Sequence, residues 1–143
     1  MKIIRISTDN EISIHEFPDE LSVSEQNQFL RELIGPKCSL VEHVMPKRLY
    51  SHLGGSNRVS RERGSCVSML VDEEGLWHDV PVNTVGSWLY ETDIHGHFIV
   101  GNILIIGEVW RRDGISFCGM NDEQFDLLYP TLEMLTKKAR GKE

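Results

Sequence analysis

Apolar and polar residues alternate near the start of the chain with the two-residue period of a β-strand. Ile4 and Ile6 share one face of a strand that this pattern predicts over residues 2–7. After a polar turn at residues 8–11, Ile12 and Ile14 alternate with polar residues again. The two strands are therefore predicted to form a hairpin.

Helical spacing of apolar residues follows at positions 29, 30, 33 and 34. Ser22 or Ser24 is predicted to begin this helix, and Ser22 with Glu25 has the spacing of a capping box. Gly35-Pro36 is predicted to end it, because proline cannot continue a helix and glycine suits a left-handed cap.

Shorter patterns predict the remaining strands and helices. Strands are expected over residues 39–45, 66–71, 76–82 and 98–107, with a further hairpin joining residues 109–110 to residues 115–118. Asn83 is predicted to cap a short helix through Tyr90, before a polar turn at residues 91–97. Asn121 is predicted to cap the last helix, with Gln124 at the reciprocal position, and Pro130 to kink or split it.

Antiparallel hairpins with a few helices indicate an α+β fold and not a doubly wound parallel sheet. We predict one domain over residues 1–136, a mostly antiparallel sheet with two or three helices packed on it, followed by a frayed tail at residues 137–143. Residues 46–64 have little apolar periodicity and contain Pro46, Gly54-Gly55 and Gly64. They are predicted to form a long exposed loop inserted into the domain.

The composition of the 143-residue chain, 40% hydrophobic and 26% charged, is typical of globular proteins. Its three cysteines are too few and too widely spaced for a disulfide framework or a paired-cysteine zinc motif. The first ten residues carry no long apolar core, so we expect no secretory signal, and the longest apolar run, residues 99–107, is too short to cross a bilayer. A cytoplasmic protein without a membrane partner fits these features.

Charge is distributed unevenly along the chain, which has a formal net charge of −7. Residues 46–64 carry five basic side chains and one acidic one, whereas residues 65–109 carry seven acidic side chains and neither lysine nor arginine. Because the acidic protein as a whole repels phosphate backbones, we expect no binding of duplex nucleic acid. A small anion held locally by several arginines is compatible with this distribution.

The order and spacing of several short motifs resemble a known family. The motifs are Lys2-Ile3-Ile4-Arg5-Ile6, Leu33-Ile34-Gly35, Val71-Asp72-Glu73-Glu74-Gly75-Leu76, Pro81-Val82-Asn83, the run from Ile99 to Gly107, and Asn121-Asp122-Glu123-Gln124. In these motifs the chain resembles domain-of-unknown-function family 3846, a set of small proteins common in bacteriophages and mobile elements. The chain departs from the family pattern in residues 46–64, which look like an insertion, and in a longer last helix. The resemblance implies a phage-type setting and supplies no catalytic residues.

The basic segment is the first candidate site. Lys47, Arg48, Arg58, Arg61 and Arg63 lie around a Gly-Gly pair. Arginine forks suit phosphate or carboxylate oxygens, and glycine lets backbone N–H groups approach an anion. The segment has no phosphate-loop pattern. Its alternatives are a solvated loop or a strip that meets the acidic surface of a neighbouring subunit.

Aromatic, histidine and cysteine residues supply weaker candidates. Trp110, followed by Arg111 and Arg112, could stack on a nucleobase and clamp its phosphate, although ordinary packing is the commoner role of a tryptophan. His95 and His97 are weak metal candidates without a third ligand at a suitable spacing. No cysteine or serine lies in a recognisable nucleophile motif, so we predict no cofactor and lean against catalysis.

Our leading hypothesis is a non-enzymatic protein that sequesters a phosphate-bearing, nucleotide-like molecule, such as a host signalling nucleotide, through the basic segment and residues 110–112. The alternative is an acidic interaction module in which residues 65–109 bind and modulate a basic host protein. A metal-dependent enzyme built on His95 and His97 is the third hypothesis. We also expect a homo-oligomer, since symmetric dimers are the commonest assemblies.

Overall fold

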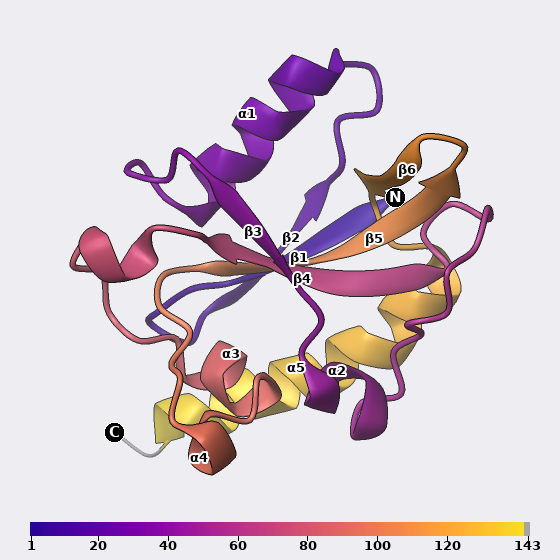
Figure 1. The fold of residues 1–143 in the computed structure, drawn as a ribbon. Helices are drawn as coiled ribbons and strands as arrows, with labels where there is room; N and C mark the ends of the chain where they lie inside the picture. Colours follow the sequence, from indigo (N-terminus) through magenta and orange to yellow (C-terminus); the bar gives the residue numbers. More distant parts are fainter. Residues whose placement is uncertain (142–143) are drawn as a thin grey trace.

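Over residues 1–141, the fold is an antiparallel six-stranded sheet with five α-helices and one 3₁₀ helix (Figure 1). A computed structural model describes residues 1–141. The strands are β1 (Lys2–Ile6), β2 (Ile12–Glu16), β3 (Val41–Val44), β4 (Cys66–Asp72), β5 (Ile103–Arg111) and β6 (Gly114–Cys118). The helices are α1 (Val23–Ile34), α2 (Lys47–Ser51), η1 (Gly75–Trp77), α3 (Thr84–Leu89), α4 (Thr92–His95) and α5 (Asp122–Gly141). The α+β prediction is confirmed, with more helices than expected.

Strand β5 is the centre of the sheet. The strand order is β2-β1-β5-β4-β3. β1 pairs with residues 103–105 of β5, and β6 pairs with residues 107–111 of the same strand. Every pairing is antiparallel. Ile103, Leu104, Ile105 and Ile106 are fully buried, because both faces of β5 are covered. This explains the continuous apolar run, which is typical of strands that are covered on both sides.

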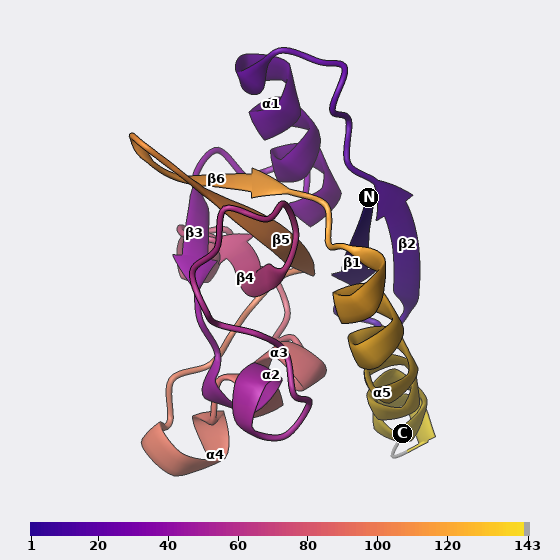
Figure 2. The ribbon, with the colours of Figure 1, turned by 90° about the vertical axis from the view of Figure 1, so that its right-hand side faces the viewer.

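Helices cover the two faces of the sheet unequally, which gives three layers (Figures 1 and 2). Helix α1 packs on one face, where Leu30 and Ile34 meet Leu104 and Ile106. Helices α2, α3 and α5 pack on the opposite face, where residues such as Leu89 cluster with Ile103 and Ile105. The two sets of β5 side chains alternate between these clusters, as the period of a strand requires.

Helix ends follow the sequence signals in part. Ser22 accepts the Glu25 N–H and Glu25 reaches back to Ser22, so the predicted capping box is confirmed. Gly35 ends α1 with φ 165°, an extended conformation and not the left-handed cap that was expected. Asn121 caps α5 through the N–H of Gln124. Gln124 does not return the bond, because its side-chain oxygen accepts the N–H of Ser56 at 2.9 Å instead.

The prediction of one long exposed loop over residues 46–64 is wrong. The segment begins with α2, in which Leu49 is fully buried, and Leu53 and Gly55 are buried beyond it. A helix of five residues has too few apolar positions to show a period, so sequence pattern alone does not reveal it. The rest of the segment runs along the surface toward β4 (Figure 2).

The predicted return strand over residues 76–82 is also wrong. Both edges of β4 are already occupied, by β3 and by β5, so a return strand has no partner there. The chain instead forms η1, in which Trp77 N–H donates to the carbonyl of Glu74. The end of this segment forms an isolated bridge between Val82 and Val100, which is not the predicted pairing with residues 66–71. Strand β5 correspondingly begins at Ile103 and continues to Arg111, later than predicted.

The last helix is longer and more regular than predicted. Helix α5 continues through Pro130, which lies on the exposed side with Asp126, where water can replace the missing hydrogen bond. Residues 137–141 belong to the helix and not to a frayed tail, since Thr136 is buried and Arg140 donates to the carbonyl of Asn10. Residues 142–143 of the predicted tail lie outside the described part of the chain.

Asn83 joins three parts of the fold. Its side-chain oxygen accepts the N–H of Gly86 at the start of α3, and its amide donates to the carbonyls of Ile6 and Gly101 at 3.1 and 3.0 Å. The side chain is fully buried. Replacing it with alanine removes a helix cap and leaves buried backbone groups without partners.

We predict that Asn83→Ala lowers the free energy of unfolding by about 2–4 kcal/mol. Urea denaturation followed by circular dichroism measures this difference. Asn27→Ala, at an exposed position of α1, is the matched control and should change the free energy by less than about 0.5 kcal/mol. Equal effects of the two substitutions would contradict the structural role of Asn83.

Candidate functional site

The end of β5 that extends past its pairing with β4 positions the candidate site. β5 pairs with β4 only as far as Glu108 but continues with β6 to Arg111. Beyond β4, the N–H of Trp110 donates to the carbonyl of Ser60 at 2.8 Å. The segment that precedes β4 therefore lies beside the projecting end of β5 and brings part of the basic segment next to residues 110–112.

Gly64 fixes the approach of this segment. Its φ is +74°, and an added Cβ would lie 2.4 Å from the carbonyl oxygen of Gly119, so only glycine fits the position. Its N–H donates to the carbonyl of Glu108, and its carbonyl accepts the N–H of Asn121 at the start of α5. These bonds hold the preceding residues, among them Arg61 and Arg63, against the end of β5.

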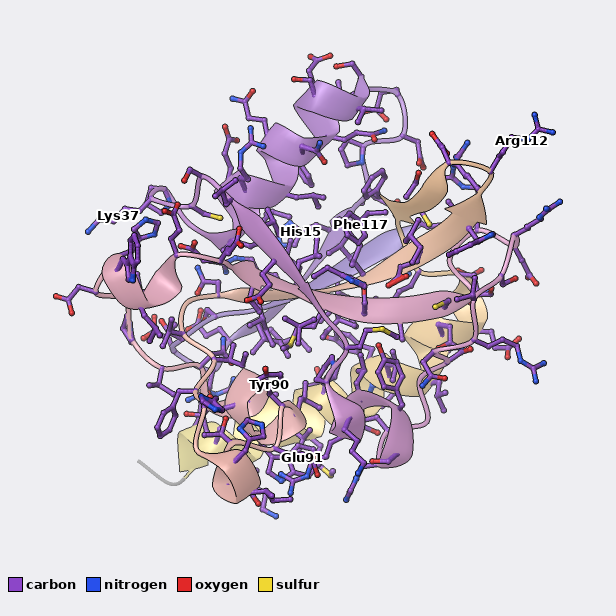
Figure 3. All side chains as sticks on the ribbon, in the orientation of Figure 1. His15, Lys37, Tyr90, Glu91, Arg112 and Phe117 are labelled. Atoms are coloured by element: carbon purple, nitrogen blue, oxygen red, sulfur yellow. The ribbon has the colours of Figure 1, made fainter. Side chains whose placement is uncertain are left out.

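Side chains from both segments line a shallow depression of about 420 Å³. The lining residues are Arg61, Arg63, Val109, Trp110, Arg111 and Arg112. We call it the arginine–tryptophan depression. Trp110 is 42% exposed, which leaves part of the indole ring available for contact. Arg112 extends outward at the tip of the β5–β6 hairpin (Figure 3). Four arginines and one tryptophan thus line one open surface.

Positive charge in the depression is only partly neutralised. Within residues 1–141, Arg61, Arg111 and Arg112 have no carboxylate within 4.0 Å, whereas Arg63 forms an ion pair of 2.6 Å with Asp19. Arg63 and Arg111 also border a neighbouring depression of about 550 Å³ that Asp19 and Asp113 share. The arginine–tryptophan depression itself is lined by no acidic side chain, so it is the side of this region that suits an anion.

Five of the eight predicted ligand-binding residues border this depression, and three do not. Arg48 is buried and forms two hydrogen bonds to Asp93, at 2.6 and 3.0 Å, and one to the carbonyl of Trp88. Its guanidinium also lies 5.0 Å from the centre of the Trp88 ring. Lys47 is exposed in α2, and Arg58 is exposed outside the depression. The expectation that the whole basic segment converges is therefore wrong, since Arg48 is a structural clamp between α2 and α4.

The predicted histidine pair lies at the end of α4, where His95 is the last helical residue and His97 follows Gly96. His95 Nε2 is 2.6 Å from the carbonyl of Tyr90, and its Nδ1 accepts the N–H of His97. Both ring nitrogens of His95 are thus occupied within this segment. Across residues 1–141, no group of three or more histidine, cysteine, aspartate or glutamate side chains is arranged to hold a metal ion.

The acidic stretch of residues 65–109 presents less charge to solvent than its sequence suggests. Asp72 and Glu108 are buried beside histidines: Asp72 lies 2.7 Å from His78, and Glu108 lies 2.7 Å from His43. Asp93 is paired with Arg48. Sequence reasoning missed these pairs, because 65 residues separate His43 from Glu108 and 45 separate Arg48 from Asp93.

The cysteines have the character of buried thiols. Burial raises the pKa of Cys66 to about 11, and burial is also the largest cause that raises the pKa of Cys38 to about 11. Burial raises the pKa of Cys118 as well. Since the thiolate is the reactive form, none of the three is a ready nucleophile at neutral pH.

None of the helices in the described part of the chain combines the length and apolar character needed to cross a bilayer.

We predict that thiol-specific reagents modify the folded protein slowly at pH 7. Cys38, which is partly exposed, should react first, and Cys66 and Cys118 should react only after unfolding. Mass spectrometry of peptides after timed alkylation, with a urea-unfolded sample as control, measures the order. Rapid labelling of Cys66 in the folded protein would contradict its placement.

The Arg48–Asp93 pair predicts a dependence of stability on pH. The hydrogen bond from Arg48 holds the pKa of the Asp93 carboxyl below its ordinary value of 3.8. The folded state therefore takes up this proton less readily than the unfolded state. The stabilisation is complete above pH about 4 and is lost as the pH falls through the lowered folded-state pKa.

Asp93→Asn should consequently be less stable than the wild type at pH 6, and the difference should shrink below pH about 4. Thermal unfolding across this range measures the difference. Asp126→Asn, at an exposed position of α5, is the control. A gap between wild type and Asp93→Asn that grows on acidification would show that the pair does not act as described.

Comparison with known proteins adds no assignment to this geometry, because no family model, no curated protein and no solved structure matches the chain.

Proposed function

We propose that the protein is a non-enzymatic binding protein for a small phosphate-bearing molecule of the nucleotide type. The arginine–tryptophan depression is the proposed site. The observation that carries the proposal is that three arginines without carboxylate partners in the described chain, Arg61, Arg111 and Arg112, line the same depression as the partly exposed Trp110. Such a combination of cation and aromatic face matches the two chemical parts of a nucleotide.

Four of the six lining residues have a definite role in this proposal. The planar guanidinium groups of Arg61 and Arg111 donate paired hydrogen bonds to phosphate oxygens, which a lysine cannot do in the same geometry. Arg63 remains bonded to Asp19 and orients that wall of the depression. The exposed part of Trp110 offers a face on which a base stacks, for roughly 1–3 kcal/mol.

The lining residues favour binding over catalysis. They comprise four arginines, a valine and a tryptophan, and among them is no side chain that accepts a proton at neutral pH. Arginine remains protonated, and valine and tryptophan do not titrate. A phosphate ester held here would be contacted by hydrogen-bond donors without a general base or a nucleophile from the lining.

The depression is open, so we expect binding to depend strongly on charge. Phosphate in an exposed site is screened by salt, and affinity should fall as ionic strength rises. In the phage-type setting that the sequence resemblance implies, binding without turnover would withdraw a host signalling nucleotide from its receptor. This role and a cytoplasmic location stay predictions.

Isothermal titration calorimetry with a panel of nucleoside mono-, di- and cyclic phosphates tests the proposal. We expect at least one of them to bind the wild type, and Arg61→Ala, Arg111→Ala and Trp110→Ala each to weaken that binding by about tenfold or more. Arg58→Ala is the matched control, because Arg58 lies on the same segment outside the depression.

The unphosphorylated nucleoside should bind far more weakly than its phosphate, since the arginines recognise the charge. Circular dichroism confirms that each variant is folded. No binding of any panel member, or equal loss of binding in Arg58→Ala and Arg61→Ala, would contradict the proposal.

A further inference from the structure

A second feature of the molecule lies at the other end of the sheet, at the segment that follows β4. Leu76 and Trp77 in η1 are 76% and 85% exposed. We call these two residues, together with the nearby acidic residues Glu73, Glu74 and Asp79, the Trp77 projection. Tryptophan is seldom so fully exposed, and adjacent exposed apolar residues mark interaction surfaces more often than isolated ones do. Nothing in the nucleotide proposal uses these two side chains.

The Trp77 projection is anchored to the sheet by hydrogen bonds and by close packing. The carboxylate of Asp72 accepts the N–H of Glu74 at 2.9 Å and lies 2.7 Å from His78 Nδ1, which closes the segment on both sides of η1. Gly75 packs against Val100 so closely that a Cβ would lie 2.6 Å from the Val100 side chain. An anchored projection loses little conformational entropy on binding.

A matching slot lies between α3 and α5. This depression of about 200 Å³ is lined by Thr84, Val85, Trp88, Leu135, Lys138 and Ala139. We call it the α3–α5 slot. Its volume is several times the roughly 30 Å³ that one water molecule takes in the liquid, so it has room for a sizeable group. Its lining is mostly apolar, and an apolar aromatic group is the chemistry that such a lining favours.

The projection and the slot carry opposite charges. Three acidic residues, Glu73, Glu74 and Asp79, lie within four positions of Trp77 in the sequence. One cation, Lys37, lies on the same side of the molecule and offsets part of this negative charge (Figure 3). Lys138 lines the slot, and no carboxylate of residues 1–141 lies within 4.0 Å of it. Acidic side chains around the projection would thus meet a basic side chain at the slot, which favours this pairing over association of two like surfaces.

We propose that two copies of this chain form a two-fold symmetric dimer in which Trp77 of each copy inserts into the α3–α5 slot of the other. Residues 78–83 connect η1 to α3, and the segment after β4, α3 and the C-terminal end of α5 all lie on the side of the molecule away from β6 (Figure 1). With a two-fold axis beside this end, the projection of each copy faces the slot of the other copy. Burying Trp77 would remove about 150–250 Å² from water at each of the two contacts.

The dimer leaves the arginine–tryptophan depression open, because that site lies at the opposite end of β5. Nucleotide binding and dimer formation are therefore separate properties. Trp77→Ala should abolish only the dimer and Trp110→Ala only the nucleotide binding, so failure of one proposal is distinguishable from failure of the other.

Sedimentation equilibrium of the full chain over a range of concentrations tests the proposal. We expect a reversible monomer–dimer equilibrium for the wild type and an increase of about thirtyfold or more in the dissociation constant for Trp77→Ala. Trp110→Ala, which replaces the other exposed tryptophan, should leave the dissociation constant unchanged. Because Trp77 makes few contacts in the monomer, Trp77→Ala should fold normally, as circular dichroism can show.

A charge reversal examines the slot itself. Lys138→Glu should weaken the dimer, whereas Lys137→Glu, on the neighbouring position of α5 outside the slot, should change it much less. A wild-type chain that stays monomeric at all concentrations would overturn the proposal. So would a dimer that Trp77→Ala and Lys138→Glu leave intact, since its interface would then lie elsewhere, or a larger assembly that does not stop at two copies.

Discussion

The burial of β5 on both faces is the constraint on which the rest of the structure depends. Four consecutive side chains, Ile103 to Ile106, are fully buried, two against α1 and two against α2, α3 and α5. At about 1.5–3 kcal/mol for each buried aliphatic side chain, these four side chains contribute about 6–12 kcal/mol to folding. The strand also pairs with β1, β4 and β6, so both halves of the sheet depend on its position.

The length of β5 also explains the position of the arginine–tryptophan depression. β5 is longer than β4, and its last residues project past the pairing with Glu108. The projecting backbone needs a hydrogen-bond partner, which Ser60 provides. As a result, Arg61 and Arg111, which are 50 residues apart in the sequence, line the same depression as Trp110. Arg111 and Arg112 thus lie at the end of β5 that pairs with β6 but extends past β4.

The sequence predicts the parts of the fold that have local causes. The first hairpin, the Ser22 capping box, the Asn83 cap and the β5–β6 hairpin each depend on residues close in sequence, and the structure confirms all four. Failures have non-local causes. The return strand after β4 is absent because β3 and β5, distant in sequence, already occupy both edges of β4.

The candidate site follows the same division. Residue type and proximity identified Trp110, Arg111 and Arg112 as a possible clamp, and the basic character of residues 46–64 supplied Arg61 and Arg63. Composition could not separate these two from Arg48, which has the same chemistry. Only the tertiary position of Asp93 shows that Arg48 is buried in a structural ion pair, and no local pattern carries that information.

The most direct test of the central claim is a heteronuclear NMR titration that observes the indole N–H of Trp110 and the Nε–H groups of the arginines. Addition of a nucleoside phosphate should shift the signals of Trp110, Arg61 and Arg111, and leave that of Arg48 in place. A titration that moves none of these signals, or that moves Arg48 as much as Arg61, would show that the end of β5 that extends past β4 is not an anion site.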